Sequence, residues 1–429
     1  MQGERPERPG TKRQELEARV PVRLRARRAP WIGAVAVAFV ANGLGGPSFL
    51  ARLPERQSDL GLSDATLGLT LVGMALGAMA ASPVAGGFVS RVGSRPVLLV
   101  AAGGLGASLW TVGAAPNAPT LFAALTLVGA TDAAMDISMN ANGAAYENRS
   151  GRSVMHGLHG TWSLGALAAA GIAAAGAATG VPLTLHLALV GAVIAGSVLA
   201  TRRGLVGDDA RPSVAGGPGA PEPTPGRAVA SRWPIRPIVV LAAATVGGAI
   251  LEGAPSDWSA IQLERMGVAA GVSALGYAAF MAGMVGGRFA GDRLTDRFGG
   301  AVVLRGGTAL VAAGLLIGIA VNHPAAFAIG LALAGLGAAG FFPLAFSAAA
   351  RTGGVSPGSG AAAVSLAARL GFMVEPVIVG AVAELLSLRW AFGLVAIVAL
   401  VLAAAAPRIV PGPGPSTMAA VRLADVREP

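Results

Sequence analysis

Apolar segments of about 20 residues recur along the chain from Trp31 to Val410, separated by short polar segments. An α-helix of that length crosses the ~30 Å hydrocarbon core of a bilayer. The pattern therefore predicts twelve membrane spans in two groups of six. The first six are expected at 31–52, 66–88, 96–115, 119–142, 157–178 and 181–201, and the second six at 236–258, 271–291, 300–321, 324–349, 359–384 and 388–409. We expect an all-α polytopic membrane protein.

Three polar tracts delimit these spans. Residues 1–29 are polar and basic, residues 202–235 are rich in Pro and Gly, and residues 410–429 contain few large apolar side chains. Such tracts cannot bury enough apolar surface to fold, so we expect two tails and a disordered linker. Six-helix bundles are then expected at 30–201 and 236–409. The first apolar segment is too long for a signal-peptide core and is interpreted as an uncleaved span.

Composition agrees with a membrane protein, and the charges add an orientation. Mean hydropathy is +0.64, with 54% hydrophobic and 13% charged residues. A net charge of +10 could suit a nucleic-acid partner, but 27 of the 32 basic residues fall in the tails, the linker and alternate loops, against four in the opposite loops. By the positive-inside rule, both termini are cytoplasmic and the chain lies in the inner (cytoplasmic) membrane, with no nucleic-acid partner. The absence of Cys excludes disulfides and thiolate metal sites.

The two halves of the chain repeat. The sequence GGPSF (Gly45–Phe49) matches GAPSD (Gly253–Asp257), and the longer stretch Gly73–Leu99 matches a second-half segment in which Arg297 aligns with Arg91. Two six-span repeats place a substrate site near the bilayer midplane, at the interface between the repeats.

Two loops carry related charged motifs, one between spans 2 and 3 and one between spans 8 and 9. The first contains Gly86, Arg91, Gly93 and Arg95, and the second contains Asp292, Arg293, Asp296, Arg297 and Gly299. These motifs resemble the G-x-x-x-D-R-x-G-R-R/K signature of the major facilitator superfamily, although Ser90 replaces the usual Asp in the first copy and Asp292 the opening Gly in the second. The resemblance covers residues 30–409 and implies the major facilitator fold. It also implies a gating role for the loops, holding the halves in an outward-open state; the alternative is that the charges only fix topology.

Another resemblance involves span 4 and the segment after it. Asp136, Met139 and Asn140, followed by HGLHGTWSLG, resemble the fucose-permease-like branch of the superfamily. This implies proton-coupled handling of a small polar solute such as a sugar. Trp162 and Trp258 could then stack on a sugar ring, or alternatively serve as interfacial anchors.

Candidate site residues are the polar groups inside spans. Asp132, Asp136 and Asn140 follow one another at intervals of four residues, so they share one helix face. An ionised carboxylate in hydrocarbon is costly and normally faces a partner or a wet cavity. The other residues expected at this cavity are Asn42, Glu252, Arg369 and Glu375. For each, the alternative is a purely structural role such as a helix–helix hydrogen bond, and Arg369 could either neutralise a carboxylate or bind an anionic substrate.

These observations predict a secondary active transporter, symporter or antiporter, that works by alternating access. We expect proton coupling and a sugar-like or other small polar solute, with a proton-driven drug or metabolite exporter as the alternative. Either Asp132 or Asp136 would carry the proton, and the stronger family match favours Asp136. Neither a Walker A sequence nor H-E-x-x-H is present, so we expect no enzyme activity and no direct ATP drive.

The remaining expectations concern partners. The partners are a small-molecule substrate, protons and the lipid bilayer, and the protein is expected to act as a monomer. We expect no cofactor and no metal. His156 and His159 lie one turn apart, but no third ligand accompanies them, so both are interpreted as interfacial.

Overall fold

The computed structural model describes residues 31–150, 154–207, 235–352 and 357–410, and every regular element in these ranges is a helix. The first half contains α2 (Ile32–Leu50), α3 (Leu53–Asp59), α4 (Asp64–Val92), α5 (Ser94–Ala114), α6 (Ala118–Ser150), α7 (Met155–Ala178) and α8 (Leu183–Thr201). The second half contains α9 (Ile235–Arg265), α10 (Ala270–Ser273), α11 (Leu275–Phe298), α12 (Gly300–Val321), α13 (Pro324–Ala338), α14 (Phe341–Ala350), α15 (Pro357–Leu385) and α16 (Leu388–Ile409).

The predicted spans correspond to these helices in order. Eleven helical segments of the described chain are long and apolar enough to cross a membrane. The twelfth predicted span, α11, is not among them because its second half carries the charges of the second loop motif. Span 10 was predicted as one helix but divides into α13 and α14 at residues 339–340. The short helix α3 lies in a loop for which no helix was predicted, whereas α10 overlaps the start of the predicted span 271–291, which divides into α10 and α11.

Local sequence signals explain several helix boundaries. Ser63 caps α4, because its hydroxyl accepts a hydrogen bond from the Thr66 N–H, and Pro324 begins α13, where no N–H donor is needed. Gly93 and Gly299 end α4 and α11 with φ of 90° and 82°, a backbone conformation that side chains disfavour. These two positions explain why both loop motifs contain glycine at this point.

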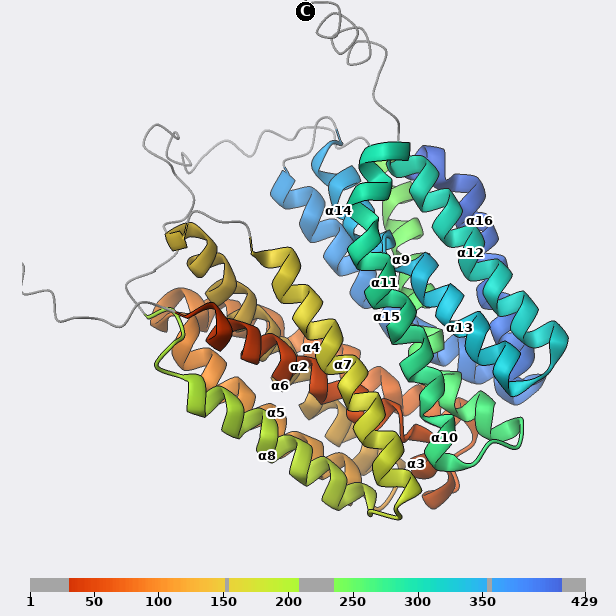
Figure 1. Ribbon diagram of the computed structural model, residues 1–429, viewed down its shortest axis with the longest axis horizontal. Coiled ribbons are helices and arrows are strands. Elements are labelled where there is room, and N and C mark those ends of the chain that lie inside the picture. The colour runs from red at the N-terminus through yellow and green to blue at the C-terminus, as the bar shows by residue number, and fades with distance from the viewer. Residues whose placement is uncertain (1–30, 151–153, 208–234, 353–356, 411–429) are drawn as a thin grey trace, which may run out of the picture.

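The helices form two bundles, α2–α8 and α9–α16, with equivalent internal packing (Figure 1). In the first bundle α4 packs on α6, and a Cβ atom at Gly129 would collide with the carbonyl oxygen of Met74. In the second bundle α11 packs on α13, and a Cβ atom at Gly335 would collide with the carbonyl oxygen of Phe280. The same small-residue contact at equivalent places supports the internal repeat.

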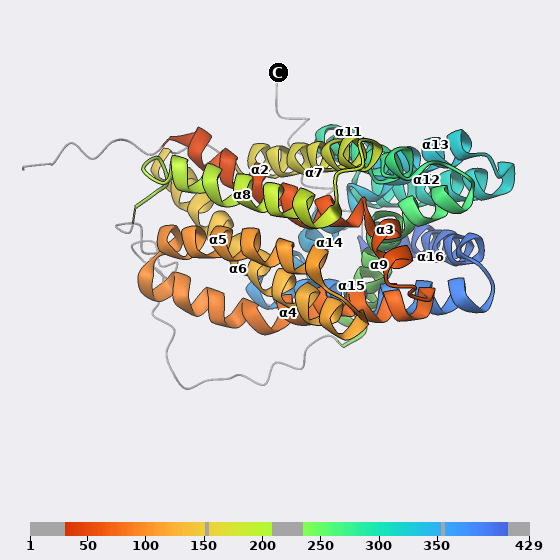
Figure 2. The same cartoon turned by 90° about the horizontal axis from the view of Figure 1, so that it is seen from below.

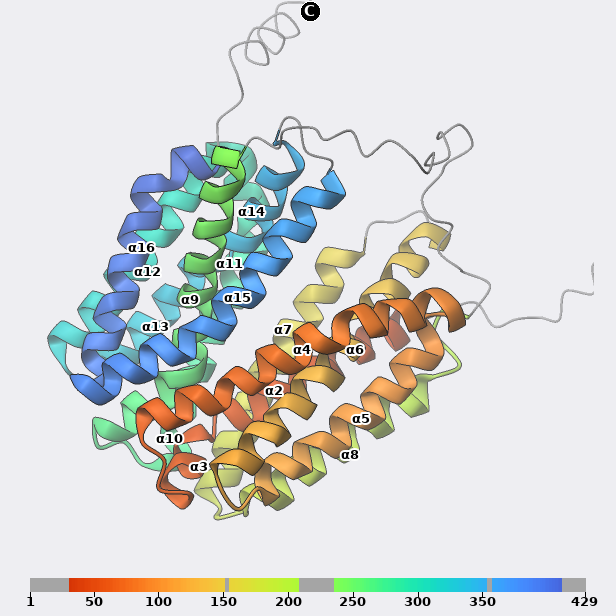
Figure 3. The ribbon, with the colours of Figure 1, turned by 180° about the vertical axis from the view of Figure 1, so that it is seen from behind.

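The two bundles meet at one end of the molecule and diverge towards the other. They lie closest near α3 and α10, and their ribbons separate towards the end where α14 finishes and α7 begins (Figures 1 and 3). The view from below places α3 and α9 where the bundles adjoin (Figure 2). Contacts between bundles come from α15 on α4, α7 on α10 and α11, and α3 on α9.

The tract predicted as a linker begins later than expected. Leu205 and Val206 are buried, and Asn142 of α6 holds both backbone polar groups of Val206 by hydrogen bonds of 3.2 Å. Residues 202–207 therefore belong to the first bundle. Residues 208–234 of the predicted linker, and residues 1–29 and 411–429 of the predicted tails, lie outside the described residues.

Candidate functional site

The polar face predicted on α6 is present, and its first member is held by a relay of hydrogen bonds. Asn42 of α2 donates to the carboxylate of Asp132 at 2.9 Å, and Trp162 of α7 donates from its indole nitrogen to the Asn42 side-chain oxygen at 2.8 Å. Three helices thus fix the orientation of the Asp132 carboxylate. The alternative interpretation of Asp132, a structural helix–helix hydrogen bond, is consistent with this contact.

Asp136, one turn further along α6, has different partners. The Asn140 amide donates to its carboxylate and to its backbone carbonyl, both at 2.9 Å. The guanidinium of Arg369, on α15 of the other bundle, attracts the Asp136 carboxylate, while Asp132 and Asp136 repel each other. Arg369 and Asp136 form no ion pair within the described residues, so which of the two uses expected for Arg369 applies stays a prediction.

Arg288 of α11 is a site residue that sequence reasoning missed. Its Nη2 lies 3.8 Å from the carboxylate of Glu252 on α9, and its Nη1 donates to the Ser163 hydroxyl at 2.6 Å. Its guanidinium also lies over the indole ring of Trp162, 5.7 Å from the ring centroid. The charge count places Arg288 at the cytoplasmic end of the predicted span 271–291, among the basic residues that set topology. The internal repeat indicated a position within the membrane for Arg288. The alignment of Arg91 with Arg297 places Arg288 opposite Ser82, which lies inside the predicted span 66–88.

These contacts form one continuous polar chain, defined here as Asp132, Asn42, Trp162, Arg288 and Glu252. It begins in the first bundle and ends in the second. With Asp136 and Arg369 beside it, the interface holds three carboxyl groups and two guanidinium groups. One proton added to a carboxyl would balance the formal charge.

The wall contributed by α14 is aromatic rather than polar. The repeat that pairs Gly129 with Gly335 places Phe342 opposite Asp136. Phe342 stacks on Phe372 of α15 with ring centroids 6.0 Å apart, and both rings are partly exposed. The corresponding positions in the two halves therefore differ in chemistry although their helices pack alike.

Two of the expected residues lie elsewhere. Glu375 of α15 is 1% exposed and packs against Gly253 of α9, inside the second bundle rather than on the polar chain. Trp258 has no exposed surface, so neither sugar stacking nor interfacial anchoring describes it in this conformation.

The loop motifs lie at the end where the bundles diverge. Arg91, Asp292, Arg293, Asp296 and Arg297 are exposed. Within the described residues, Asp296 makes neither an ion pair nor a hydrogen bond, whereas Ser90 donates to the carbonyl of Gly87 at 2.8 Å. The motifs do not connect the bundles in this conformation.

At the opposite end, three side chains that the sequence did not single out join the bundles, and we call them the interbundle latch (Asp64, Arg265 and Glu384). Arg265 of α9 forms an ion pair with Asp64 at the start of α4. Glu384 of α15 accepts a hydrogen bond of 2.9 Å from the Asp64 N–H. A carboxylate at a helix N-terminus is electrostatically favourable, so each bundle stabilises a charge on the other.

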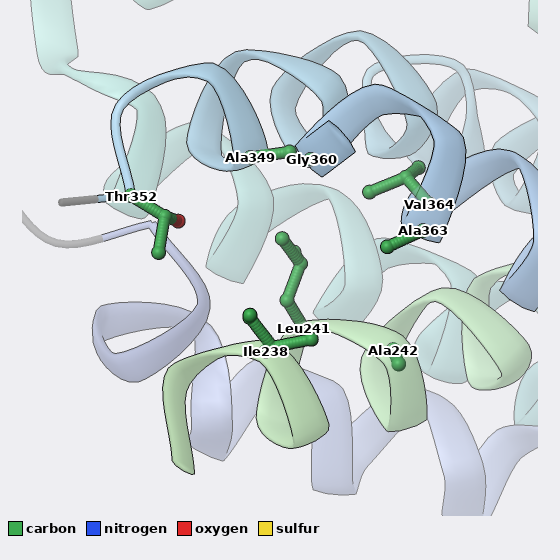
Figure 4. A pocket seen from close by; sticks show the side chains of 8 residues that line it. All are labelled: Ile238, Leu241, Ala242, Ala349, Thr352, Gly360, Ala363 and Val364. Atoms are coloured by element: carbon green, nitrogen blue, oxygen red, sulfur yellow. The ribbon is translucent and has the colours of Figure 1, made fainter. Parts of the chain in front are cut away.

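A small pocket between α9, α14 and α15 is not a solute site (Figure 4). Its volume is about 10 Å³, and it is lined almost entirely by apolar side chains such as Ile238, Leu241 and Val364. That volume corresponds to about one water molecule.

Comparisons with known proteins identify relatives and the fold. The sequence profile of the Major Facilitator Superfamily matches residues 31–299 and 258–425. An uncharacterized MFS-type transporter of Yersinia pestis is 32% identical over 372 residues, which are 86% of this chain and 93% of the relative. The membrane protein MosC of Rhizobium meliloti is 31% identical, covering 87% of this chain and 89% of MosC. A crystal structure of a variant of the nucleoside transporter NupG superposes with a TM-score of 0.69 at 12% identity, covering 88% of this chain and 99% of that one.

Proposed function

The chain belongs to the major facilitator superfamily, and from this premise we propose that it is a proton-coupled secondary transporter of a small polar solute. It is an integral, multi-pass membrane protein of a transporter family. The observation that carries the proposal is the polar chain, which links Asp132 in one bundle to Glu252 in the other. A solute held there contacts both halves, as alternating access requires.

The charge balance of the interface supports proton coupling. Three carboxyls and two guanidiniums, all partly buried, leave one negative charge, and removing a carboxyl from water favours its protonated form. Asp132 has an amide donor but no cation in contact, whereas Asp136 is attracted by Arg369. Asp132 and Asp136 lie one turn apart on α6, where two negative charges are unfavourable, so we assign the transported proton to the pair. The family resemblance favours Asp136 as the proton carrier, whereas the lack of a facing cation favours Asp132.

The chemistry of the two walls supports a solute with a polar edge and a flat or apolar face. Carboxylates, amides and guanidiniums on one side match hydroxyl groups, and the Phe342–Phe372 stack on the other side matches a ring. Sugar-like solutes meet this description, in agreement with the resemblance to the fucose-permease-like branch. A proton-driven exporter of an aromatic metabolite or drug is the second candidate, favoured by the same aromatic wall.

The conformation gives the proposal a direction of access. With both termini in the cytoplasm of the inner membrane, as the basic residues predict, the end where the bundles diverge is cytoplasmic (Figures 1 and 3). The site then opens inwards, and the interbundle latch closes the outer end. The exposed loop motifs would form their contacts in the opposite, outward-open state.

Counterflow of radiolabelled solute in proteoliposomes tests the proposal. A thermal-shift screen of sugars, nucleosides and aromatic metabolites on the purified monomer supplies the solute, because a ligand stabilises the state it binds. We expect counterflow without nucleotide for a stabilising solute, and its loss in Arg288→Ala. Exchange that requires ATP, or that survives Arg288→Ala unchanged, would contradict the proposal.

A further inference from the structure

A second pair of acidic residues lies inside the second bundle, away from the polar chain. Glu375 of α15 is 1% exposed, and neither of its carboxylate oxygens has a hydrogen-bond partner. Its polar neighbours are Asp257 and Trp258 of α9, which lie within reach but outside hydrogen-bond geometry. The indole N–H of Trp258 is likewise buried and without a partner. Asp257 is partly exposed, so a buried carboxyl without a partner, a partly exposed carboxyl and one free donor lie together in this region.

The backbone on the other side of this site is bare. A Cβ atom at Gly253 would lie 2.8 Å from a carboxylate oxygen of Glu375, so the carboxyl packs directly on the α9 backbone. This glycine belongs to the repeated GAPSD segment, and Asp257 is its last residue. The first-half counterpart of Asp257 is Phe49, so the acidic pair is specific to the second half.

The charged groups at the bundle interface and in the interbundle latch have other partners. Arg369, on the same helix, acts on Asp136, and Arg288 of α11 pairs with Glu252. On the membrane-surface side, the charged groups are those of the interbundle latch, which pair with one another. The remaining titratable neighbour, Tyr277 of α11, is buried and interacts with Asp257 without supplying a positive charge. Among the described residues, no ion pair includes Asp257 or Glu375.

A buried carboxylate with neither a cation nor a hydrogen-bond donor, such as that of Glu375, is costly to ionise, and a second carboxylate nearby raises that cost. We propose that Asp257 and Glu375 form a proton-binding site in the second bundle that is loaded in this conformation. The bound proton lets one carboxyl donate to the other once their side chains align. The Trp258 N–H is positioned to serve the carboxylate that remains when the proton leaves.

The position of the pair links this proton to the outer end of the molecule. Gly68 of α4 packs against the carbonyl of Pro376, the residue after Glu375, and Gly380 packs against the Asp64 backbone and the Trp258 ring. The α4–α15 contact therefore covers the acidic pair on the side of the other bundle. When the bundles separate at this end, water reaches the pair and its proton can exchange. This exchange of the proton with water rests on the proposed function, whereas the binding of a proton by Asp257 and Glu375 does not.

Infrared spectroscopy of the full-length protein in lipid tests the site directly. We expect the wild type to show the carbonyl stretch of a protonated carboxylic acid, with a shift in D₂O, at a pH where exposed carboxyls are ionised. Glu375→Gln should lose the component of this band that remains when Asp132→Asn/Asp136→Asn removes the other proposed proton site. Glu384→Gln, a glutamate on the same helix that is exposed and hydrogen-bonded at the latch, should keep it. Asp257→Asn serves as a second variant if Glu375→Gln does not fold, and it should also change the band.

The outcomes separate this inference from the proposed function. A band that is undiminished in both Glu375→Gln and Asp257→Asn, or is absent from the wild type, overturns the site even if a pH gradient drives transport. A band lost in Glu375→Gln supports the site. If pH-driven accumulation is then absent from the wild type, the proton coupling fails while the proton-binding site stands.

Discussion

Opening of the outer end should depend on the interbundle latch, and the combined change Arg265→Gln with Glu384→Gln removes it. The Arg265–Asp64 pair joins a buried carboxylate to a guanidinium that is 39% exposed, so solvent reduces its contribution to about 1 kcal/mol. Glu384 of α15 accepts a hydrogen bond at the N-terminus of α4 and adds a charge–dipole contribution of about 0.5–1 kcal/mol. Together they amount to roughly 2 kcal/mol, which is about a 30-fold change in a two-state equilibrium.

Distances between two spin labels measure this shift. The chain has no Cys, so labels on cysteines introduced at Leu185 of α8 and Leu386, both exposed at the outer end, report without background. We expect the double variant to populate a longer distance that is rare in the unsubstituted protein. Arg389→Gln is the matched control, because Arg389 is exposed at the same end and makes no ion pair within the described residues. An unchanged distribution in the double variant, or an equal shift in the control, would refute the reasoning.

Three further changes have distinct expected results. Arg288→Lys should lower solute affinity in a thermal-shift titration by about tenfold, since an ammonium replaces the guanidinium that contacts Ser163 and the indole face; an unaltered titration would exclude a role in binding. Asp296→Asn should favour the inward-open state in the same spin-label experiment, whereas Ser90→Ala should not, because only the second motif retains the carboxylate. Gly129→Ala should destabilise the protein by about 1–3 kcal/mol through collision of α6 with α4, while Gly103→Ala, where the added atom meets open space, should leave thermal stability unchanged.

The helices were predictable because hydrophobic length is a property of local sequence. The predicted spans 300–321 and 388–409 coincide with α12 and α16. The largest difference is at α6, which continues eight residues beyond its predicted end, and α9 and α11 each continue seven residues, because charged residues within a helix near the membrane surface resemble a loop. The break between α13 and α14 depends on packing and left no clear signal.

Most residues of the site could be predicted from the sequence, but the contacts between them could not. Asp132 was identified as a costly intramembrane carboxylate, but its partner Asn42 is 90 residues distant, and no periodicity connects the two. Arg288 was misassigned because charge counting cannot distinguish a loop arginine from one directed into the bundle interface. Glu375 was assigned to the shared cavity because the sequence does not state which face of α15 meets α9.

The central claim is that the Asp132–Asp136 pair carries the proton that drives transport. The most direct test is accumulation of the screened solute in proteoliposomes under an imposed pH gradient, compared between the wild type and the double variant Asp132→Asn/Asp136→Asn. A neutral pair can neither load nor release a proton, yet its amides can still hydrogen-bond the solute. The account predicts that gradient-driven accumulation disappears in the variant while solute exchange at equal pH persists. Accumulation that responds to the pH gradient equally in both proteins would contradict it.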